Sequence, residues 1–128
     1  MTNFIYAYNK RKFINMNKCK WVVEVLNKTT KKIVGQFDIV MTNCGKPSMS
    51  IEVNENYQGL GISKKMISKL IESLNYANIC KLKNVYIDTN ASYFGNGTSF
   101  WQKVGVESGN FNGWEGKTTL SRLYCKST

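Results

Sequence analysis

Residues 58–63 read Gln58-Gly59-Leu60-Gly61-Ile62-Ser63, and the prediction of the fold rests on them. They follow a short apolar strand at residues 49–53 and open an amphipathic helix expected at residues 61–76. Glycines at a strand-to-helix turn leave backbone N–H groups unshielded, and the first turn of a helix adds unpaired N–H groups of its own. Such donors, converging at the positive end of a helix dipole, form an anion site. The run therefore predicts a turn that holds a diphosphate.

The glycine spacing excludes two common phosphate loops. A P-loop requires Gly-x-x-x-x-Gly-Lys-Ser/Thr, and this string does not occur in the chain. A dinucleotide fingerprint requires Gly-x-Gly-x-x-Gly, but Lys64 stands at the third glycine position after Gly59 and Gly61. A reading without a ligand stays open, in which the glycines only let the helix pack closely on a sheet.

The run resembles the acetyl-CoA loop of the GNAT N-acetyltransferase superfamily, Gln/Arg-x-x-Gly-x-Gly/Ala. Gln58 takes the first position and Gly61 the fourth, while Ser63 stands where the family has Gly or Ala. Residues 99–106 are similar to the family's Phe-Tyr-x-Lys-Leu-Gly-Phe segment. The resemblance covers residues 20–125. It implies an α/β fold with a central mixed sheet, in which a βαβ crossover helix joins two parallel, splayed strands, and a shortened N-terminal helical region.

The rest of the chain is interpreted around this βαβ unit. In the family, the stretch at residues 9–20 carries one or two helices over the acceptor site, but here at most one short helix fits. Residues 109–116 are rich in glycine and are expected to form a hairpin loop. The other expected elements are strands at residues 3–8, 21–26, 32–40, 85–88 and 118–125.

Size and composition favour one GNAT-like domain over residues 1–128, with 42% apolar residues to build a core. The chain has no apolar run of membrane-spanning length, and its start lacks the pattern of a signal peptide. Four scattered cysteines and no histidine make a metal site and histidine-based catalysis poor hypotheses. These observations predict a cytoplasmic protein with reduced thiols and without a membrane or metal partner.

The net charge of +10 permits a nucleic-acid interpretation. Its candidate stacking platform is the alternation of aromatic and basic side chains at Phe13, Lys18, Lys20 and Trp21. However, 16 of the 18 basic residues are Lys, whereas base and bidentate phosphate recognition favour Arg. The charge also attracts a polyanion such as coenzyme A, and it argues against polycationic acceptors unless a local acidic patch exists.

The resemblance assigns roles to individual residues. The coenzyme would bind to Val53 on the splayed strand, to Asn90 after the next strand, and to the loop residues Gln58, Gly59, Leu60, Gly61, Ile62 and Ser63. The family's general acid is a Tyr, but Trp101 stands at its place, and an indole N–H does not titrate near neutral pH. Tyr93 is the nearest substitute acid. Glu52 is the favoured base, since it neighbours Val53 and a carboxylate buried there could accept a proton. An exposed or salt-bridged Glu on a strand fits the sequence equally well.

The leading hypothesis is an acetyl-CoA-dependent N-acetyltransferase that transfers the acetyl group directly to an amine of a small molecule or polypeptide. One alternative is a non-catalytic acyl-CoA-binding module of the same fold, motivated by the missing Tyr and the shortened acceptor cover. The other alternative is the basic nucleic-acid-binding protein. Because edge strands often meet in this family, the resemblance also leaves a homodimer open.

Overall fold

The computed structural model describes residues 3–13, 18–41, 45–87, 98–111 and 113–128. The elements are β1 (Phe4–Phe13), β2 (Lys18–Asn27), β3 (Ile33–Met41), β4 (Pro47–Val53), the 3₁₀ turn η1 (Glu55–Tyr57), α1 (Ile62–Ser73), α2 (Tyr76–Lys81), β5 (Asn84–Ile87), α3 (Thr98–Lys103), β6 (Glu107–Phe111), β7 (Trp114–Thr119) and α4 (Leu120–Ser127). The longest described helix, α1, has 12 residues, so no helix in these ranges has the roughly 20 residues that a bilayer crossing requires.

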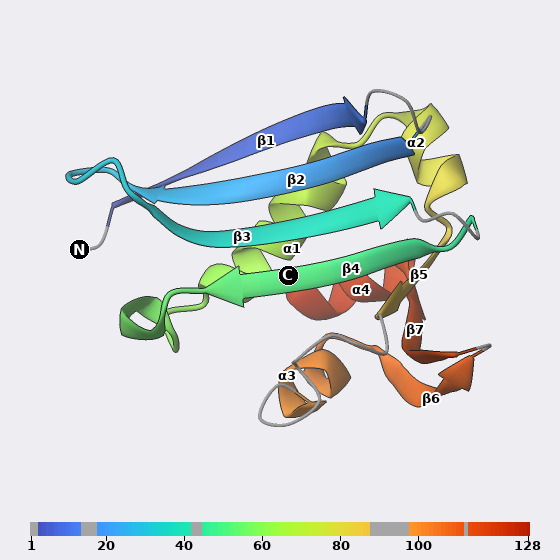
Figure 1. Ribbon diagram of the computed structural model, residues 1–128. Coiled ribbons are helices and arrows are strands. Elements are labelled where there is room, and N and C mark those ends of the chain that lie inside the picture. The colour runs from blue at the N-terminus through green and yellow to red at the C-terminus, as the bar shows by residue number, and fades with distance from the viewer. Residues whose placement is uncertain (1–2, 14–17, 42–44, 88–97, 112) are drawn as a thin grey trace.

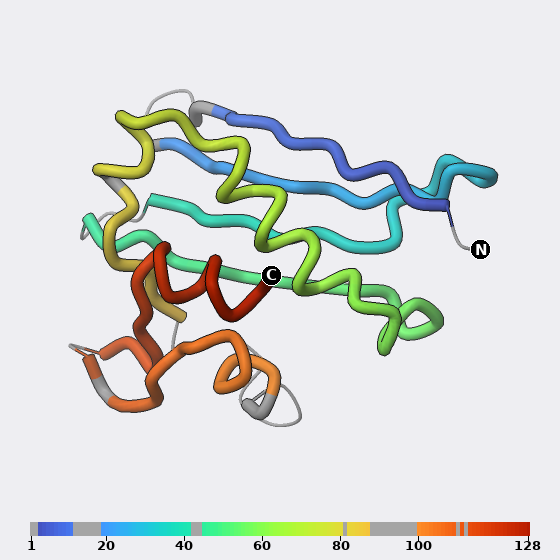
Figure 2. Tube along the Cα trace, turned by 180° about the vertical axis from the view of Figure 1, so that it is seen from behind, coloured from blue at the N-terminus to red at the C-terminus, as the bar shows by residue number. Residues whose placement is uncertain are grey.

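The strands form one seven-stranded sheet in the order β1-β2-β3-β4-β5-β7-β6. β1 to β4 are antiparallel, β4 and β5 are parallel, and β7 lies between β5 and β6. Figure 1 shows the broad surface of β1–β4 at the front, with α1 and α4 behind it. Figure 2, from behind, shows α1 running across these strands with α4 beside it. This is the predicted mixed α/β fold.

The sheet has one apolar face and one face of mixed polar and apolar side chains, because alternate side chains of a strand point to opposite sides. Trp21, Val23 and Val25 of β2 are buried toward α1 with Phe37 and Ile39 of β3. The predicted apolar stripe of α1 closes this core through Ile62, Met66, Ile67 and Leu70. The front face of β1–β4 carries no described helix, and we call it the open face (Figure 1).

The central βαβ unit is confirmed. β4 and β5 are parallel, and α1 lies between them in the chain. Their described pairing is confined to Ser48 with Tyr86 and Met49 with Ile87, although β4 continues to Val53. Over the described residues, the last part of β4 is therefore paired on one side only, by β3.

The described part of residues 9–20 contains no helix, although one short helix over the acceptor site was expected there. Among the described residues of the 9–20 stretch, 9–13 extend β1 and 18–20 begin β2, so that a long hairpin replaces a helix. The alternation that was expected to end at residue 8 continues to Phe13. The residues described in this stretch therefore give the open face no helical cover of the kind that the family resemblance suggested.

The crossover helix ends earlier than predicted. α1 stops at Ser73, where Leu74 turns to extended backbone, and Asn75 starts the separate helix α2 by accepting a hydrogen bond from the Asn78 amide at 2.9 Å. Asparagine competes with helical hydrogen bonding through such local bonds, and it is a preferred N-cap. One expected helix is therefore two.

Two predictions for the C-terminal part are wrong. β6 and β7 do form a hairpin here, but residues 109–111 and 114–116 belong to its strands and not to a loop. Gly116 lies in β7, where a Cβ would come within 2.8 Å of Val106, so the position requires glycine. The closing strand ends at Thr119 instead of Cys125. The Thr119 side chain accepts a hydrogen bond from the Arg122 amide at 3.1 Å and caps α4, which buries Leu120 and Leu123.

Candidate functional site

The glycine loop exposes the backbone donors that the sequence predicted. Gly59 and Gly61 have φ values of +83° and +76°, which belong to the left-handed region, and Gly59, Leu60 and Gly61 are exposed. Gly61 is the N-cap of α1 and has no side chain to satisfy the first amides of the helix. Within the described residues, no hydrogen bond engages the amides of Gly59, Leu60 or Gly61. The loop thus offers N–H groups from Gly59 to Ser63.

Gln58 differs from the other loop residues. Its amide donates to the Glu55 carbonyl at 3.4 Å, so it is engaged within η1. Its side-chain amide donates to the Val53 carbonyl at 3.1 Å. Gln58 therefore ties the loop to the end of β4, and its position in the motif is explained by this bond within the chain.

Backbone groups at the end of β4 point toward the side on which no described residue pairs with the strand. The Asn54 amide donates to the Val34 carbonyl at 2.8 Å, which makes this a hydrogen-bonded pair of the β3–β4 ladder. Because such pairs alternate in antiparallel sheets, the amides and carbonyls of Ile51 and Val53 face away from β3. The Val53 carbonyl accepts the bond from Gln58, and the Val53 amide has no strand partner in the described residues.

A hollow of about 420 Å³ lies beside the loop, between α1 and the start of β1. Its lining includes Leu60 and Gly61 of the loop and the cations Lys28 and Lys65. The Lys65 ammonium lies 5.0 Å from the ring centre of Tyr6, and burial raises the pKa of the Tyr6 hydroxyl above its ordinary value. Neither lysine forms an ion pair with a described residue, so both charges remain available to an anion. Sequence reasoning missed this hollow because the lysines are 37 residues apart and only the folded sheet brings them together.

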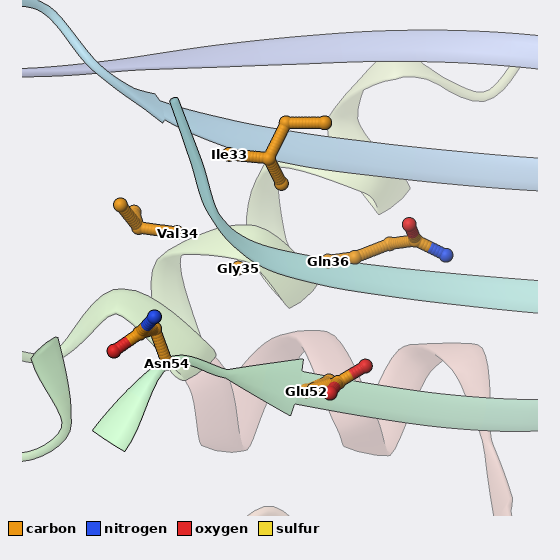
Figure 3. Close-up of a pocket in the computed structure, with 6 residues that line it drawn as sticks. All are labelled: Ile33, Val34, Gly35, Gln36, Glu52 and Asn54. Carbon is orange, nitrogen blue, oxygen red and sulfur yellow. The ribbon is translucent and has the colours of Figure 1, made fainter. Parts of the chain in front are cut away.

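A second hollow, of about 240 Å³, is lined by Ile33, Val34, Gly35, Gln36, Glu52 and Asn54. Figure 3 shows Gln36 and Glu52 extending side by side from β3 and β4, where they form a register pair. The Gln36 amide group donates to the Asp38 carboxylate at 2.9 Å. Asp38 is nearly buried and also accepts a hydrogen bond from the Ser50 hydroxyl at 2.7 Å. A fixed polar network thus lies next to Glu52 on the open face.

The predicted catalytic residues are placed only in part. Glu52 neighbours Val53 as expected, and its side chain is exposed, which is one of the environments that the sequence left open. Burial on this uncovered face comes from neighbouring side chains, as it does for Asp38, and Glu52 is left exposed. Tyr93 and Asn90 lie outside the described residues. The coenzyme-binding residues Val53 and Gln58 to Ser63 lie together at the end of β4 and the start of α1.

Two tryptophans that the sequence analysis considered for a functional role are buried, so a ligand cannot reach them. Trp101, which the family resemblance aligned with the general-acid Tyr, is 2% exposed in α3, and its ring packs edge-on against the Phe100 ring with 5.3 Å between the ring centres. Trp21 is 1% exposed and belongs to the core, while Lys20 lies near the Asp38 carboxylate at 3.5 Å on the other face. The stacking platform that included Trp21 and Lys20 is therefore wrong. The side chains of Phe13 and Lys18 are outside the described set.

The described residues contain no group of histidine, cysteine, aspartate or glutamate side chains that could hold a metal ion. The three described free cysteines lie apart, with Cys80 in α2 and Cys125 in α4. The arrangement thus offers amides and lysine ammonium groups for an anionic ligand around the start of α1, and a carboxylate on the open face.

No protein-family model and no curated protein sequence matches the chain. Among solved structures, a protein from Exiguobacterium sp. 255-15, named by inference as an acetyltransferase, is similar with a TM-score of 0.61 at 9% identity, over 85% of this chain and 68% of that chain. A variant of the spermidine/spermine N-acetyltransferase SpeG from Vibrio cholerae has a TM-score of 0.57 at 15% identity, over 85% of this chain and 69% of that chain. A cAMP-binding acyltransferase from Mycobacterium smegmatis has a TM-score of 0.55 at 12% identity, over 84% of this chain and 36% of that chain. The sheet order, the parallel β4–β5 pair and these similarities agree: the chain has the fold of the GNAT N-acetyltransferases.

Proposed function

We propose that this chain is an acetyl-CoA-dependent N-acetyltransferase that acts by direct transfer on an amine of a small molecule or polypeptide. The observation that carries the proposal is the row of amides from Gly59 to Ser63, which no described residue engages, next to the side of β4 that has no described strand partner. The amides and the positive end of the α1 dipole suit a diphosphate. The two features together suit a coenzyme that has a diphosphate followed by an extended arm.

The coenzyme would run from the loop along β4. Its diphosphate would accept hydrogen bonds from the loop amides, and Lys28 and Lys65 would attract the 3′-phosphate into the hollow of about 420 Å³. The pantetheine arm would pair with the outward backbone groups of Ile51, as an added strand does. The Val53 amide would then be within reach of the acyl arm to polarise its carbonyl.

The acceptor amine would approach from the open face, where Glu52 lies. Glu52 first takes a proton from the ammonium and passes it to solvent. The neutral nitrogen then attacks the thioester carbonyl and gives its surplus proton to Glu52. The C–N bond forms, the C–S bond breaks, and the coenzyme thiolate receives a proton from Tyr93 or from water. Most of the acceleration would come from holding the two reactants together.

A second candidate is a module of the same fold that binds acyl-CoA without turnover. The burial of Trp101 favours it, since this side chain cannot reach a leaving thiolate from the core. The uncovered acceptor face favours it as well, because nothing described there encloses a reactive intermediate.

The test begins with coenzyme binding, measured as the shift in thermal unfolding with acetyl-CoA, desulfo-CoA and ATP. We expect selective stabilisation by the first two, and no selectivity over ATP would overturn both candidates. Thiol release from acetyl-CoA is then measured over a panel of amines. Spermidine belongs to it because two structural neighbours are named as spermidine acetyltransferases. Turnover above hydrolysis with any amine supports the enzyme, and binding without turnover supports the module.

A further inference from the structure

Three apolar side chains form a row across the open face at one end of the β1–β3 hairpins. Ile5 of β1 is opposite Leu26 of β2, which is opposite Ile33 of β3. Side chains paired in this way lie roughly 5 Å apart at Cβ, so the three form a continuous strip. Ile5 is 39% exposed and Ile33 is 55% exposed, so water contacts the strip.

A register shift in the sheet places Ile33 in this row. Val25 pairs with Gly35, but the next residue of β2, Leu26, pairs with Ile33 and not with Val34. The extra residue reverses the alternation of β3, so that Val34 is buried in the core. Ile33 also lines the hollow of about 240 Å³ that contains Glu52. The apolar row therefore continues directly into the hollow.

Glu52 is the carboxylate of this face that lacks a cation among the described residues. Glu24 pairs with Arg11 at 2.9 Å, and Asp38 lies 3.5 Å from the Lys20 ammonium. Glu52 has no such partner, although the chain carries a net charge of +10. Beside it, Gln36 uses its amide group as a donor to Asp38, which leaves its carbonyl oxygen as an acceptor. A primary ammonium has three donors and no acceptor, so it suits these two neighbouring oxygen groups.

We infer that the acceptor is a primary amine with an apolar substituent: its ammonium binds between Glu52 and Gln36, and the Ile5–Leu26–Ile33 row binds the substituent. This inference rests on the proposed function and names its substrate class. A hollow of about 240 Å³ is smaller than a typical drug-sized site, so it admits the amine head and leaves the substituent on the row outside.

A polyamine fits this surface poorly. Its second ammonium would lie over the apolar row, where it loses water without gaining a partner. The net positive charge of the chain also disfavours the approach of a polycation more than that of a monocation. The open face thus selects for one positive charge and an apolar neighbour.

The experiment is titration calorimetry of hexylamine, methylamine, 1-hexanol and spermidine, with the chain alone and with the chain saturated with desulfo-CoA. We expect hexylamine to bind at least tenfold more tightly than each of the others. Ile33→Ser should weaken hexylamine binding about fivefold and leave methylamine unchanged. Ile79→Ser is the matched control, because Ile79 is 42% exposed on α2 and outside the site.

Glu52→Gln should weaken hexylamine about fivefold and remove the dependence of its binding on salt, whereas Glu55→Gln in η1 should do neither. Three results overturn the inference: spermidine bound as tightly as hexylamine, an Ile33→Ser variant that binds hexylamine normally, or no binding of any amine. If acetyl-CoA still stabilises the chain in these cases, the coenzyme-binding proposal stands and only the acceptor class is wrong. Unchanged circular dichroism and melting temperature exclude unfolding of the variants.

Discussion

The side-chain amide of Gln58 donates to the carbonyl of Val53 at 3.1 Å, and this bond joins the glycine loop to the last residue of β4. It fixes the loop amides relative to the Val53 amide, which is the relation that a diphosphate and its attached arm would require. We expect Gln58→Ala to weaken acetyl-CoA binding about fivefold, since a hydrogen bond of this kind contributes about 1 kcal/mol. Calorimetry measures the affinity. Gln102→Ala in α3, also an exposed glutamine, is the control and should bind normally.

Gly61 and Gly45 make a matched pair for testing the loop. Their φ values are +76° and +77°, and a Cβ on either would meet no atom within 4 Å. Valine at each position should therefore cost a similar amount of stability, about 1–2 kcal/mol, for conformational reasons alone. We expect Gly61→Val to abolish the thermal shift with acetyl-CoA and Gly45→Val to retain it. Equal shifts in the two variants would contradict the assignment of the loop.

The βαβ unit could be predicted because its signals are local. Ile62, Met66, Ile67 and Leu70 recur at helical spacing, and the glycines that precede them mark the turn. The parallel direction of β5 follows from the helix between the two strands. These are the parts of the chain in which local propensity and tertiary packing agree.

The C-terminal errors show where local signals mislead. A glycine-rich segment resembles a loop, but Gly116 lies in β7 at a place where a side chain would collide with Val106, and no local pattern reveals that contact. The helix α4 had a local signal that the β-branched threonines obscured: Thr119 at a cap position, followed by leucines at a spacing of three.

The open face could not be predicted because it depends on pairing between distant residues. The row of Ile5, Leu26 and Ile33 exists only through the register of three strands and one bulge. In the same way, the pairing of Gln36 with Glu52 follows from the β3–β4 register. Glu52 was identified as a candidate by its place in the chain, and its exposed environment came from the fold.

Asp38 should be the most important polar side chain of the open face for stability. It is nearly buried and accepts hydrogen bonds from Gln36 and Ser50, with Lys20 at 3.5 Å. Removal of its carboxylate leaves these donors without a partner, so we expect Asp38→Ala to lower the free energy of unfolding by about 2–4 kcal/mol. Glu24→Ala breaks an exposed ion pair with Arg11 and should cost less than about 1 kcal/mol. Urea unfolding compares the two, and equal losses would show that Asp38 does not organise this face.

Either Tyr93 or solvent water protonates the leaving thiolate, and a substitution of Tyr93 distinguishes the two. If Tyr93 is the general acid, Tyr93→Phe should lower turnover by about 10²-fold and leave the affinity for acetyl-CoA unchanged, since only the bond-breaking step loses its donor.

Trp101→Phe is the comparison: Trp101 is buried, so this change should lower stability by about 1–3 kcal/mol and leave turnover per folded molecule unchanged. Thiol release is measured between pH 6 and pH 10, with the folded fraction of each variant taken from circular dichroism. Equal turnover of Tyr93→Phe and the natural chain over this whole range would mean that water protonates the thiolate. A large loss confined to Trp101→Phe would instead place the indole in the reaction and contradict its position in the core.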